Sequence, residues 1–308
     1  MDSSLFPFLV ADVGGTNARF GLALGLDKTS KRFSIENQKE LLCRDFESLE
    51  AVIGSYLSGF PETRITSACI AIAGPVTGDS VTMTNLNWNF SIEEIRNTFG
   101  LARLEVINDF GAQAYATLYM DQDDFVVLAP GKSHPTGNRA VLGPGTGLGV
   151  AALINSGDQW HTVCGEGGHI SYAPTSRIEM DLRTAIDPSG AHISVENLVS
   201  GPGLVNIYKA LAQIKGVKAE DITPAEISGR ALQESDPNCS EAVALFCKIL
   251  GSAAGDIALV TGAFGGVYLC GGILPKIESL LTTSQLVSGF RNKGVMAEVM
   301  ESVPLCLV

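Results

Sequence analysis

The sequence predicts an α/β protein of two domains, each with the element order βββαβαβ(α), with a cleft between them. Length is the first observation, because 308 residues are more than one hydrophobic core usually organises. The second is that strand-like and helix-like segments follow the same order in both halves. The third is a matching Gly-Thr turn at equivalent points, Gly15-Thr16 and Gly145-Thr146. Self-similarity of this kind is typical of a duplicated fold.

The first half is predicted to form a small N-terminal domain over residues 1–110, with a candidate phosphate loop near its start and Asp109 at its end. Apolar runs predict its strands, and amphipathic runs predict its helices. Ser91 and Glu94 have the spacing of a capping box, and Gly100 follows as a helix stop. The expected strands are 5–13, 19–26, one around Leu41, 67–73 and 102–107, and the expected helices are 46–57, 91–100 and 109–119.

The second half, residues 111–308, is predicted to form a larger C-terminal domain that repeats this order with inserted helices. Gly251 and Gly255 in its longest helix indicate close packing by another helix. The expected strands are 125–129, 139–142, 149–155, 159–164, 267–270 and 302–308, and the expected helices are 176–186, 204–214, 225–233, 241–260 and 276–281.

Composition excludes several classes of function. Apolar residues make up 45 % of the chain and charged residues 18 %, which is typical of a globular protein. The net charge of −12 argues against a nucleic-acid partner, because phosphate contacts need clustered Lys and Arg. The seven cysteines are odd in number and form no C-x-x-C pair, which favours reduced thiols in a cytoplasmic protein. With no signal peptide and no apolar stretch of about 18 residues, no membrane contact is expected.

Two glycine-rich turns are the strongest local signals, DVGGTN at residues 12–17 and LGPGTGLG at residues 142–149. A dinucleotide fingerprint or a P-loop would need a helix directly after the loop, whereas strand-like segments follow both turns. Each turn could be a plain hairpin, but two turns at equivalent places favour binding of phosphate oxygens by backbone N–H groups. Asp12, at the end of its strand, is expected to hold Mg²⁺ through water. A third turn, Gly271-Gly272, offers close packing for an adenine ring.

Carboxylates and amides in otherwise apolar, glycine-rich loops indicate a polyol substrate. Asp109 follows a buried strand in VINDFGAQA, where it could be a catalytic base or only the N-cap of the next helix. Asn108 beside it offers an amide to neighbouring hydroxyl groups. Glu166 and His169 share the loop GEGGHI, and Glu196 lies in ENLVSGPG.

These segments resemble the bacterial-type glucokinases of the hexokinase–actin–Hsp70 ATPase superfamily. The matching stretches are ADVGGTNARFGLA, IAGPV, TNLNW, INDFGAQAYA, GPGTGLGVA, EGGHISYAP, ENLVSGPGLVNIY and CGGILPKI. The resemblance implies two ribonuclease-H-like (actin-like ATPase) domains and ATP-dependent phosphorylation of D-glucose to glucose 6-phosphate, the entry step of glycolysis. It also implies that Asp109 is the general base for the sugar 6-hydroxyl.

The same resemblance implies a full set of binding residues. The predicted sugar-binding residues are Asn108, Glu166, His169, Glu196, Asn85 and Gly74. The predicted ATP-binding residues are Ala11, Asp12, Val13, Gly14, Gly15, Thr16, Gly143, Gly145, Thr146, Gly147, Gly271 and Gly272. ATP with Mg²⁺ is the expected cosubstrate, and Asp12 is the expected metal carboxylate.

Two alternatives remain open at this stage. One is a kinase of another hexose or of an amino sugar, and the other is a catalytically silent sugar-sensing protein on the same fold. A DNA-binding regulator of the related repressor group is not expected, because only four residues precede the first strand. No structural zinc is expected either, since Cys164 is the only cysteine near the EGGH loop.

The resemblance also bears on assembly and on the end of the chain. It implies a homodimer, although no exposed apolar stripe in the sequence indicates one. The resembled glucokinases continue past the last strand into a helix, and no such helix is expected after Val308.

Overall fold

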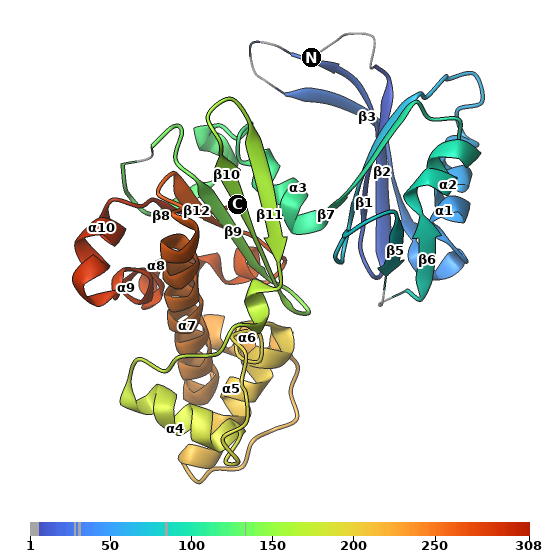
Figure 1. The fold of residues 1–308 in the computed structure, drawn as a ribbon. Coiled ribbons are helices and arrows are strands. Elements are labelled where there is room, and N and C mark those ends of the chain that lie inside the picture. The colour runs from blue at the N-terminus through green and yellow to red at the C-terminus, as the bar shows by residue number, and fades with distance from the viewer. Residues whose placement is uncertain (1–5, 28, 30–31, 84–85, 133) are drawn as a thin grey trace. The chain divides into compact units, whose positions relative to one another are not determined.

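The computed structural model describes residues 6–27, 29, 32–83, 86–132 and 134–308. The chain divides into two compact units, Met1–Tyr119 and Met120–Val308, and each unit has its own sheet and its own core (Figure 1). The division follows Tyr119 rather than residue 110, because helix α3 (Asp109–Ala116) packs against strands β4 (Ser67–Ile72) and β7 (Arg103–Asn108) of the first unit.

The sheet of the first unit has the strand order β3-β2-β1-β4-β7. Strands β1 (Phe8–Val13), β2 (Asn17–Leu26) and β3 (Phe33–Leu42) form an antiparallel meander, and β4 and β7 run parallel to β1. Helices α1 (Leu49–Leu57) and α2 (Ile92–Thr98) lie on one side of this sheet (Figure 1). The predicted order βββαβαβα is therefore confirmed for this half.

A small two-stranded sheet, β5 (Ser80–Met83) with β6 (Trp88–Ser91), was not predicted. The capping box predicted before α2 is half right. The Ser91 hydroxyl accepts a hydrogen bond from the Glu94 N–H at 3.1 Å, but the second cap is Asp79. Asp79 accepts the Ser91 O–H and the Glu93 N–H, and these two bonds lower its pKa. Asp79, twelve residues before Ser91, thus supplies the second side-chain cap of this helix, at the Glu93 N–H.

The sheet of the second unit has the strand order β11-β10-β9-β12-β13-β8. Its antiparallel meander consists of β9 (Arg139–Pro144), β10 (Leu148–Asn155) and β11 (Trp160–Gly165). Strands β12 (Gly266–Leu269) and β13 (Leu305–Leu307) run parallel to β9, as β4 and β7 do to β1. Strand β8 (Val126–Ala129) is added antiparallel to β13, so β13 is an interior strand. Both units therefore have the predicted ribonuclease-H-like arrangement.

The predicted helices of the second unit are confirmed as α4 (Arg177–Ile186), α5 (Gly201–Ile214), α6 (Pro224–Leu232), α7 (Pro237–Thr261) and α8 (Glu278–Thr283). Two short helices, α9 (Leu286–Arg291) and α10 (Ala297–Glu301), were not predicted. Single-turn 3₁₀ helices are η2 (Cys43–Asp45), η3 (Gln122–Asp124), η4 (Gly167–His169), η5 (Leu274–Ile277) and η6 (Gly294–Met296).

Helix α7 is the central helix of the second unit, extending from α5 and α6 to the sheet (Figure 1). The glycines of α7 allow α9 to pack closely against it, since a Cβ on Gly255 would lie only 2.5 Å from the carbonyl oxygen of Phe290 in α9. By length and composition alone α7 could cross a membrane, which the sequence-based prediction overlooked. However, 72 % of its most apolar window is buried inside the protein, as expected for a core helix.

Candidate functional site

The first glycine loop joins β1 to β2 in a tight turn. The Gly14 N–H donates to the Asn17 carbonyl at 2.9 Å, and the Thr16 carbonyl accepts the Cys43 N–H at 2.8 Å. A Cβ on Gly14 would meet only the Asn17 oxygen, at an ordinary 3.7 Å. The fold itself therefore does not require glycine at this position, because a Cβ would fit without a clash. The predicted ATP-binding residues Ala11 and Val13 lie in β1, on either side of Asp12. Ala11 is partly buried, and Val13 is fully buried and can offer only its backbone.

Asp12 stands at the end of β1 beside this loop, and its side chain is 56 % exposed. Residue 19 of β2 is its register partner, and Arg19 Nη1 lies 3.4 Å from Asp12 Oδ2. Arg19 Nε also donates to Glu40 Oε2 of β3 at 2.7 Å. Arg19 was not among the residues predicted from the sequence, although pairing the two predicted strands about the Gly-Gly-Thr turn would have placed it opposite Asp12.

The metal prediction rests on Asp12 alone. Among the residues that the structure describes, no group of three or more His, Cys, Asp or Glu could hold a metal ion. A single exposed carboxylate fits Mg²⁺, which usually keeps several waters and takes further oxygens from substrate phosphates. It does not fit a structural zinc site, which needs four protein ligands.

The second predicted centre of the first unit lies where β7 passes into α3. Asn108 is the N-cap of α3, because its Oδ1 accepts the Gly111 N–H at 3.1 Å. Asp109 is the first helical residue, so the interpretation of Asp109 as the N-cap is wrong. The Asn108 amide donates to Gly74 O at 3.1 Å and to Asp109 Oδ1 at 3.0 Å. Gly74 has a φ of 147°, which side-chain-bearing residues rarely adopt, so glycine is needed to place this carbonyl.

The two oxygens of Asp109 have different surroundings. Oδ1 accepts the Asn108 amide and the Phe110 N–H at 2.9 Å, which fixes the carboxylate plane. In the described part of the chain no hydrogen bond to Oδ2 is found. Burial raises the pKa of Asp109, the Phe110 N–H partly offsets this, and the charge of Asp12 raises the pKa further. The result is a half-buried, oriented carboxylate with one oxygen available as a base.

The second glycine loop joins β9 to β10, and backbone from other segments packs tightly around it. The Gly145 N–H donates to Gly147 O at 2.8 Å, and the Gly145 carbonyl accepts the N–H of Gly201, the first residue of α5, at 2.8 Å. Gly271 has a φ of 95°, and a Cβ there would lie 2.6 Å from Pro144 O. The predicted adenine turn and the second phosphate loop are therefore in contact. Beside them, Gly272 leaves open space where its side chain would be.

Glu196 connects this loop to the predicted sugar-binding loop. Its Oε2 accepts the Leu148 N–H at 2.7 Å, and a Cβ on Gly147 would lie 2.5 Å from the same oxygen. Its backbone N–H donates to Gly168 O at 2.9 Å. His169 Nε2 lies 3.8 Å from Glu196 Oε1.

The structure thus brings the predicted residues together in two sets, one in each unit. The first unit holds the loop 14–16, Asp12, Gly74, Asn108 and Asp109. The second unit holds the loops 143–147 and 271–272 with Glu166, His169 and Glu196; the Glu166 carbonyl accepts the His169 N–H at 3.0 Å. Asn85 lies outside the described residues.

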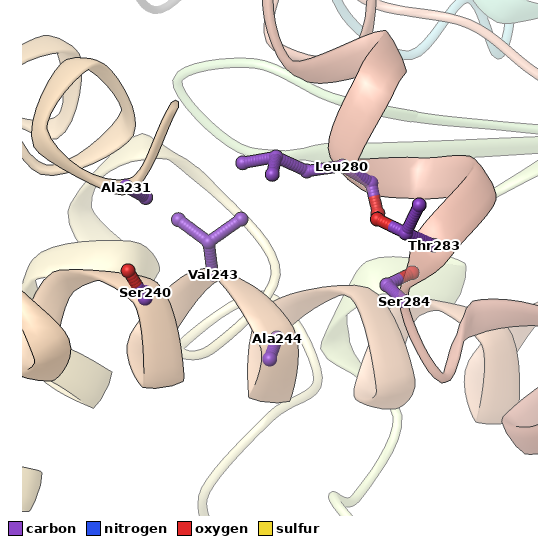
Figure 2. A pocket seen from close by; sticks show the side chains of 7 residues that line it. All are labelled: Ala231, Ser240, Val243, Ala244, Leu280, Thr283 and Ser284. Carbon is purple, nitrogen blue, oxygen red and sulfur yellow. The ribbon is translucent and has the colours of Figure 1, made fainter. Parts of the chain in front are cut away.

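A pocket of about 130 Å³ lies elsewhere in the second unit, between α6, α7 and α8 (Figure 2). It is lined by Ala231, Ser240, Val243, Ala244, Leu280, Thr283 and Ser284, none of which is a predicted site residue. Its three hydroxyl groups all donate to backbone carbonyls, so the pocket presents no unsatisfied donor to a ligand. We do not assign the chemistry to it.

Comparisons with known proteins agree with these features. The family model described as glucokinase matches residues 9–308. The glucokinase of Saccharophagus degradans is 41 % identical over 304 residues, which covers 99 % of this chain and 94 % of that protein. The crystal structure of a glucokinase from an Antarctic psychrotroph superposes with a TM-score of 0.92 at 41 % identity, over 98 % of this chain and 94 % of the other. A glucokinase from Balamuthia mandrillaris, solved with glucose, shares the fold with a TM-score of 0.78 at 22 % identity, over 97 % and 88 % of the two chains. On the full-length match and the identity to these relatives, the chain belongs to the glucokinase family.

Proposed function

We propose that this protein transfers the γ-phosphoryl group of ATP to the 6-hydroxyl of D-glucose, giving ADP and glucose 6-phosphate, the entry step of glycolysis. The observation that carries the proposal is the Asp109 carboxylate, half-buried, with Oδ1 fixed by two hydrogen bonds and Oδ2 without one in the described residues. Phosphoryl transfer to an alcohol needs a base of this kind beside bound phosphates. Membership of the glucokinase family supports the choice of sugar.

Asp109 Oδ2 would take the proton of the 6-hydroxyl as the phosphoryl group is transferred. Both hydrogens of the Asn108 amide are engaged, by Gly74 O and by Asp109 Oδ1. Asn108 would therefore act first by holding the base in place, and a sugar hydroxyl would have to compete with the Gly74 carbonyl for its amide. The Asn108 cap on α3 also holds the base at a fixed point of the backbone.

The remaining hydroxyl groups of glucose would be bound by Glu166, His169 and Glu196, with contributions from Gly74 and Asn85. Glu196 supports this assignment because the Leu148 N–H fixes one of its oxygens and His169 stands beside the other. A carboxylate held in this way accepts hydrogen bonds from two adjacent hydroxyls with little loss of side-chain entropy.

The triphosphate would lie against the loops 14–16 and 145–147, with the adenine at Gly271-Gly272. Gly14 and Gly145 use their own N–H groups to close the turns, so the remaining loop N–H groups would bind the phosphate oxygens. Arg19 would add a positive charge that neither loop supplies, because neither contains a lysine. Mg²⁺, held by Asp12 through water, would neutralise charge on the phosphate oxygens when bound.

We also propose a cytoplasmic location, no nucleic-acid or membrane partner, no structural zinc and a homodimer. The net charge of −12 supports the absence of a nucleic-acid partner, and the burial of α7 supports the absence of a membrane partner. The scattered cysteines without a C-x-x-C pair support a cytoplasmic location without structural zinc. The homodimer rests on the family resemblance, and light scattering on the purified protein tests it.

The proposed reaction is tested by ADP release from MgATP with a panel of hexoses and amino sugars. We expect the highest kcat/KM with glucose, and a product that glucose-6-phosphate dehydrogenase oxidises. A higher kcat/KM with another hexose or an amino sugar would reassign the substrate. Glucose binding by titration without ADP release for any sugar would identify a sensing protein.

A further inference from the structure

A buried carboxylate lies behind the proposed sugar-binding loops, on a helix that the proposed reaction does not use. Glu179 of α4 is 1 % exposed. Its Oε1 lies 2.6 Å from Lys248 Nζ of α7, and the Ser176 hydroxyl donates to the same oxygen at 2.8 Å. Its Oε2 accepts the Thr175 N–H at 2.9 Å and the Tyr172 hydroxyl at 3.2 Å. A charge this deeply buried is stable only when it is paired and fully hydrogen-bonded, as it is here.

These contacts keep Glu179 ionised. Burial acts to raise its pKa, but the hydrogen bonds from Lys248, Thr175 and Ser176 outweigh burial and hold the pKa below its ordinary value. Burial and the neighbouring Glu179 charge both raise the pKa of Tyr172, so the Tyr172 hydroxyl stays protonated and remains a donor to Glu179.

Tyr172 joins this network to the proposed sugar-binding residues. Backbone hydrogen bonds of 2.8–3.0 Å pair residues 168–172 with residues 193–196, from the N–H groups of Tyr172, Val195 and Glu196 to the carbonyls of Ile193, Ile170 and Gly168. The first of these segments carries His169, and the second ends at Glu196. Tyr172 is 7 % exposed and belongs to the hydrophobic core of this unit, so the paired segment is anchored in the core.

We infer that the Glu179–Lys248 pair, acting through Tyr172, positions His169 and Glu196 for the sugar. This inference rests on the proposed function, because it gives the pair a role in binding glucose. Lys248 lies on α7, the 25-residue central helix of this unit, much of which is buried. Loss of the pair would leave the loops in place but free to shift, and a shift of about 1 Å in a binding group can cost up to 10²-fold in activity.

The chain offers a matched control on the same helix. The Lys293 side chain is 8 % exposed and its Nζ lies 2.7 Å from Asp256 Oδ1 of α7, while the Lys248 side chain is 18 % exposed and its Nζ lies 2.6 Å from Glu179 Oε1. The lysines and distances are therefore similar, but the Asp256 side chain is 47 % exposed and that of Glu179 only 2 %. Lys293 also donates to Ser252 of α7. This pair ties the segment after α9 to α7, and among the described residues neither Lys293 nor Asp256 forms a hydrogen bond or ion pair with a sugar-binding loop.

The test compares Lys248→Met with Lys293→Met in the full chain. Both variants should unfold at lower temperature, since both leave a carboxylate without its cation. Only Lys248→Met should raise the KM for glucose, by about tenfold, while the KM for MgATP stays within about twofold. Tyr172→Phe keeps the ion pair and removes one hydrogen bond, so it should raise the glucose KM by about threefold and serves if Lys248→Met does not fold.

Amide hydrogen exchange separates this inference from the proposed function. The N–H groups of Tyr172, Val195 and Glu196 should exchange faster in Lys248→Met and Tyr172→Phe than in Lys293→Met. Equal exchange at these amides would overturn the positioning role, and so would equal glucose KM values in an active enzyme. An inactive wild type would overturn the proposed function, while the exchange comparison would still decide whether the pair holds the loops.

Discussion

The two glycine loops close equivalent hairpins in the two units but have different surroundings. Beside the loop 14–16 the neighbours are exposed charged side chains, and Arg19 forms ion pairs with both Asp12 and Glu40. Around the loop 145–147 the neighbours are mainly backbone and one fixed carboxylate, from Gly201, Gly271 and Glu196. The difference indicates that substitutions in the first loop region can alter its chemistry without disturbing the fold, whereas substitutions in the second loop region disturb the fold itself.

The largest expected effect comes from the first unit, where Asp109→Asn replaces the proposed base by a side chain of equal size. Turnover should fall by roughly 10²–10⁴-fold, the usual contribution of a positioned general base, while glucose binding stays largely intact. Steady-state rates and isothermal titration with glucose measure the two quantities. Retention of more than about a tenth of wild-type turnover would show that Asp109 is not the base.

A substitution in the second loop region should lower the stability of the fold. Gly271→Ala forces a Cβ against Pro144 O at a φ of 95°, and should lower the free energy of unfolding by about 2–4 kcal/mol. Gly14→Ala, which meets only ordinary contacts, should change it by less than about 0.5 kcal/mol. Urea denaturation followed by circular dichroism compares them. A Gly14→Ala variant as unstable as Gly271→Ala would remove the distinction between the loops.

Arg19 tests this comparison further, because the first loop region is expected to bind the phosphates partly through the positive charge of a side chain. Arg19→Met should lower kcat/KM for MgATP by about 10–100-fold through lost stabilisation of phosphate charge. Arg103→Met is the control, since Arg103 pairs with Glu105 on β7 of the same sheet, with a side chain 65 % exposed against 61 % for Arg19. If the two variants lose the same activity, the proposed role of Arg19 is wrong.

The smallest expected effect is on sugar selectivity, which tests the Glu166, His169 and Glu196 set of the second unit. A deoxyglucose that lacks one contacted hydroxyl leaves a polar partner unsatisfied, at about 1–3 kcal/mol. Its kcat/KM should therefore fall by roughly tenfold or more. Equal kcat/KM across a series of deoxyglucoses would mean that these residues do not bind the sugar.

The sequence predicted the strands that carry the site, because each is an apolar run ended by Gly, Pro or a polar residue. It did not predict the β5–β6 hairpin or helices α9 and α10, whose segments of four to six residues are too short for a periodic pattern to be clear. Element order and repeated motifs were therefore accessible, and short connecting elements were not.

Within the site, the sequence identified the residue types but not their hydrogen-bond partners. Asn108 and Asp109 are adjacent and both can cap a helix, and only the backbone geometry assigns the cap to Asn108. The position of Arg19 opposite Asp12 depends on the register of β1 and β2, which the length of the loop between them sets. Glu179 and Lys248 are 69 positions apart, so only tertiary structure brings them together.

The most direct test of the central claim, that Asp109 is the base, is the pH dependence of kcat/KM for glucose in the wild type and in Asp109→Asn. The base works when deprotonated, so activity should fall as the pH falls through its pKa. Because burial raises that pKa, the acid limb should lie above the ordinary aspartate value of about 3.9. The account predicts this limb in the wild type and a small residual rate without it in Asp109→Asn, at pH values where both remain folded. The same acid limb in both proteins would contradict it.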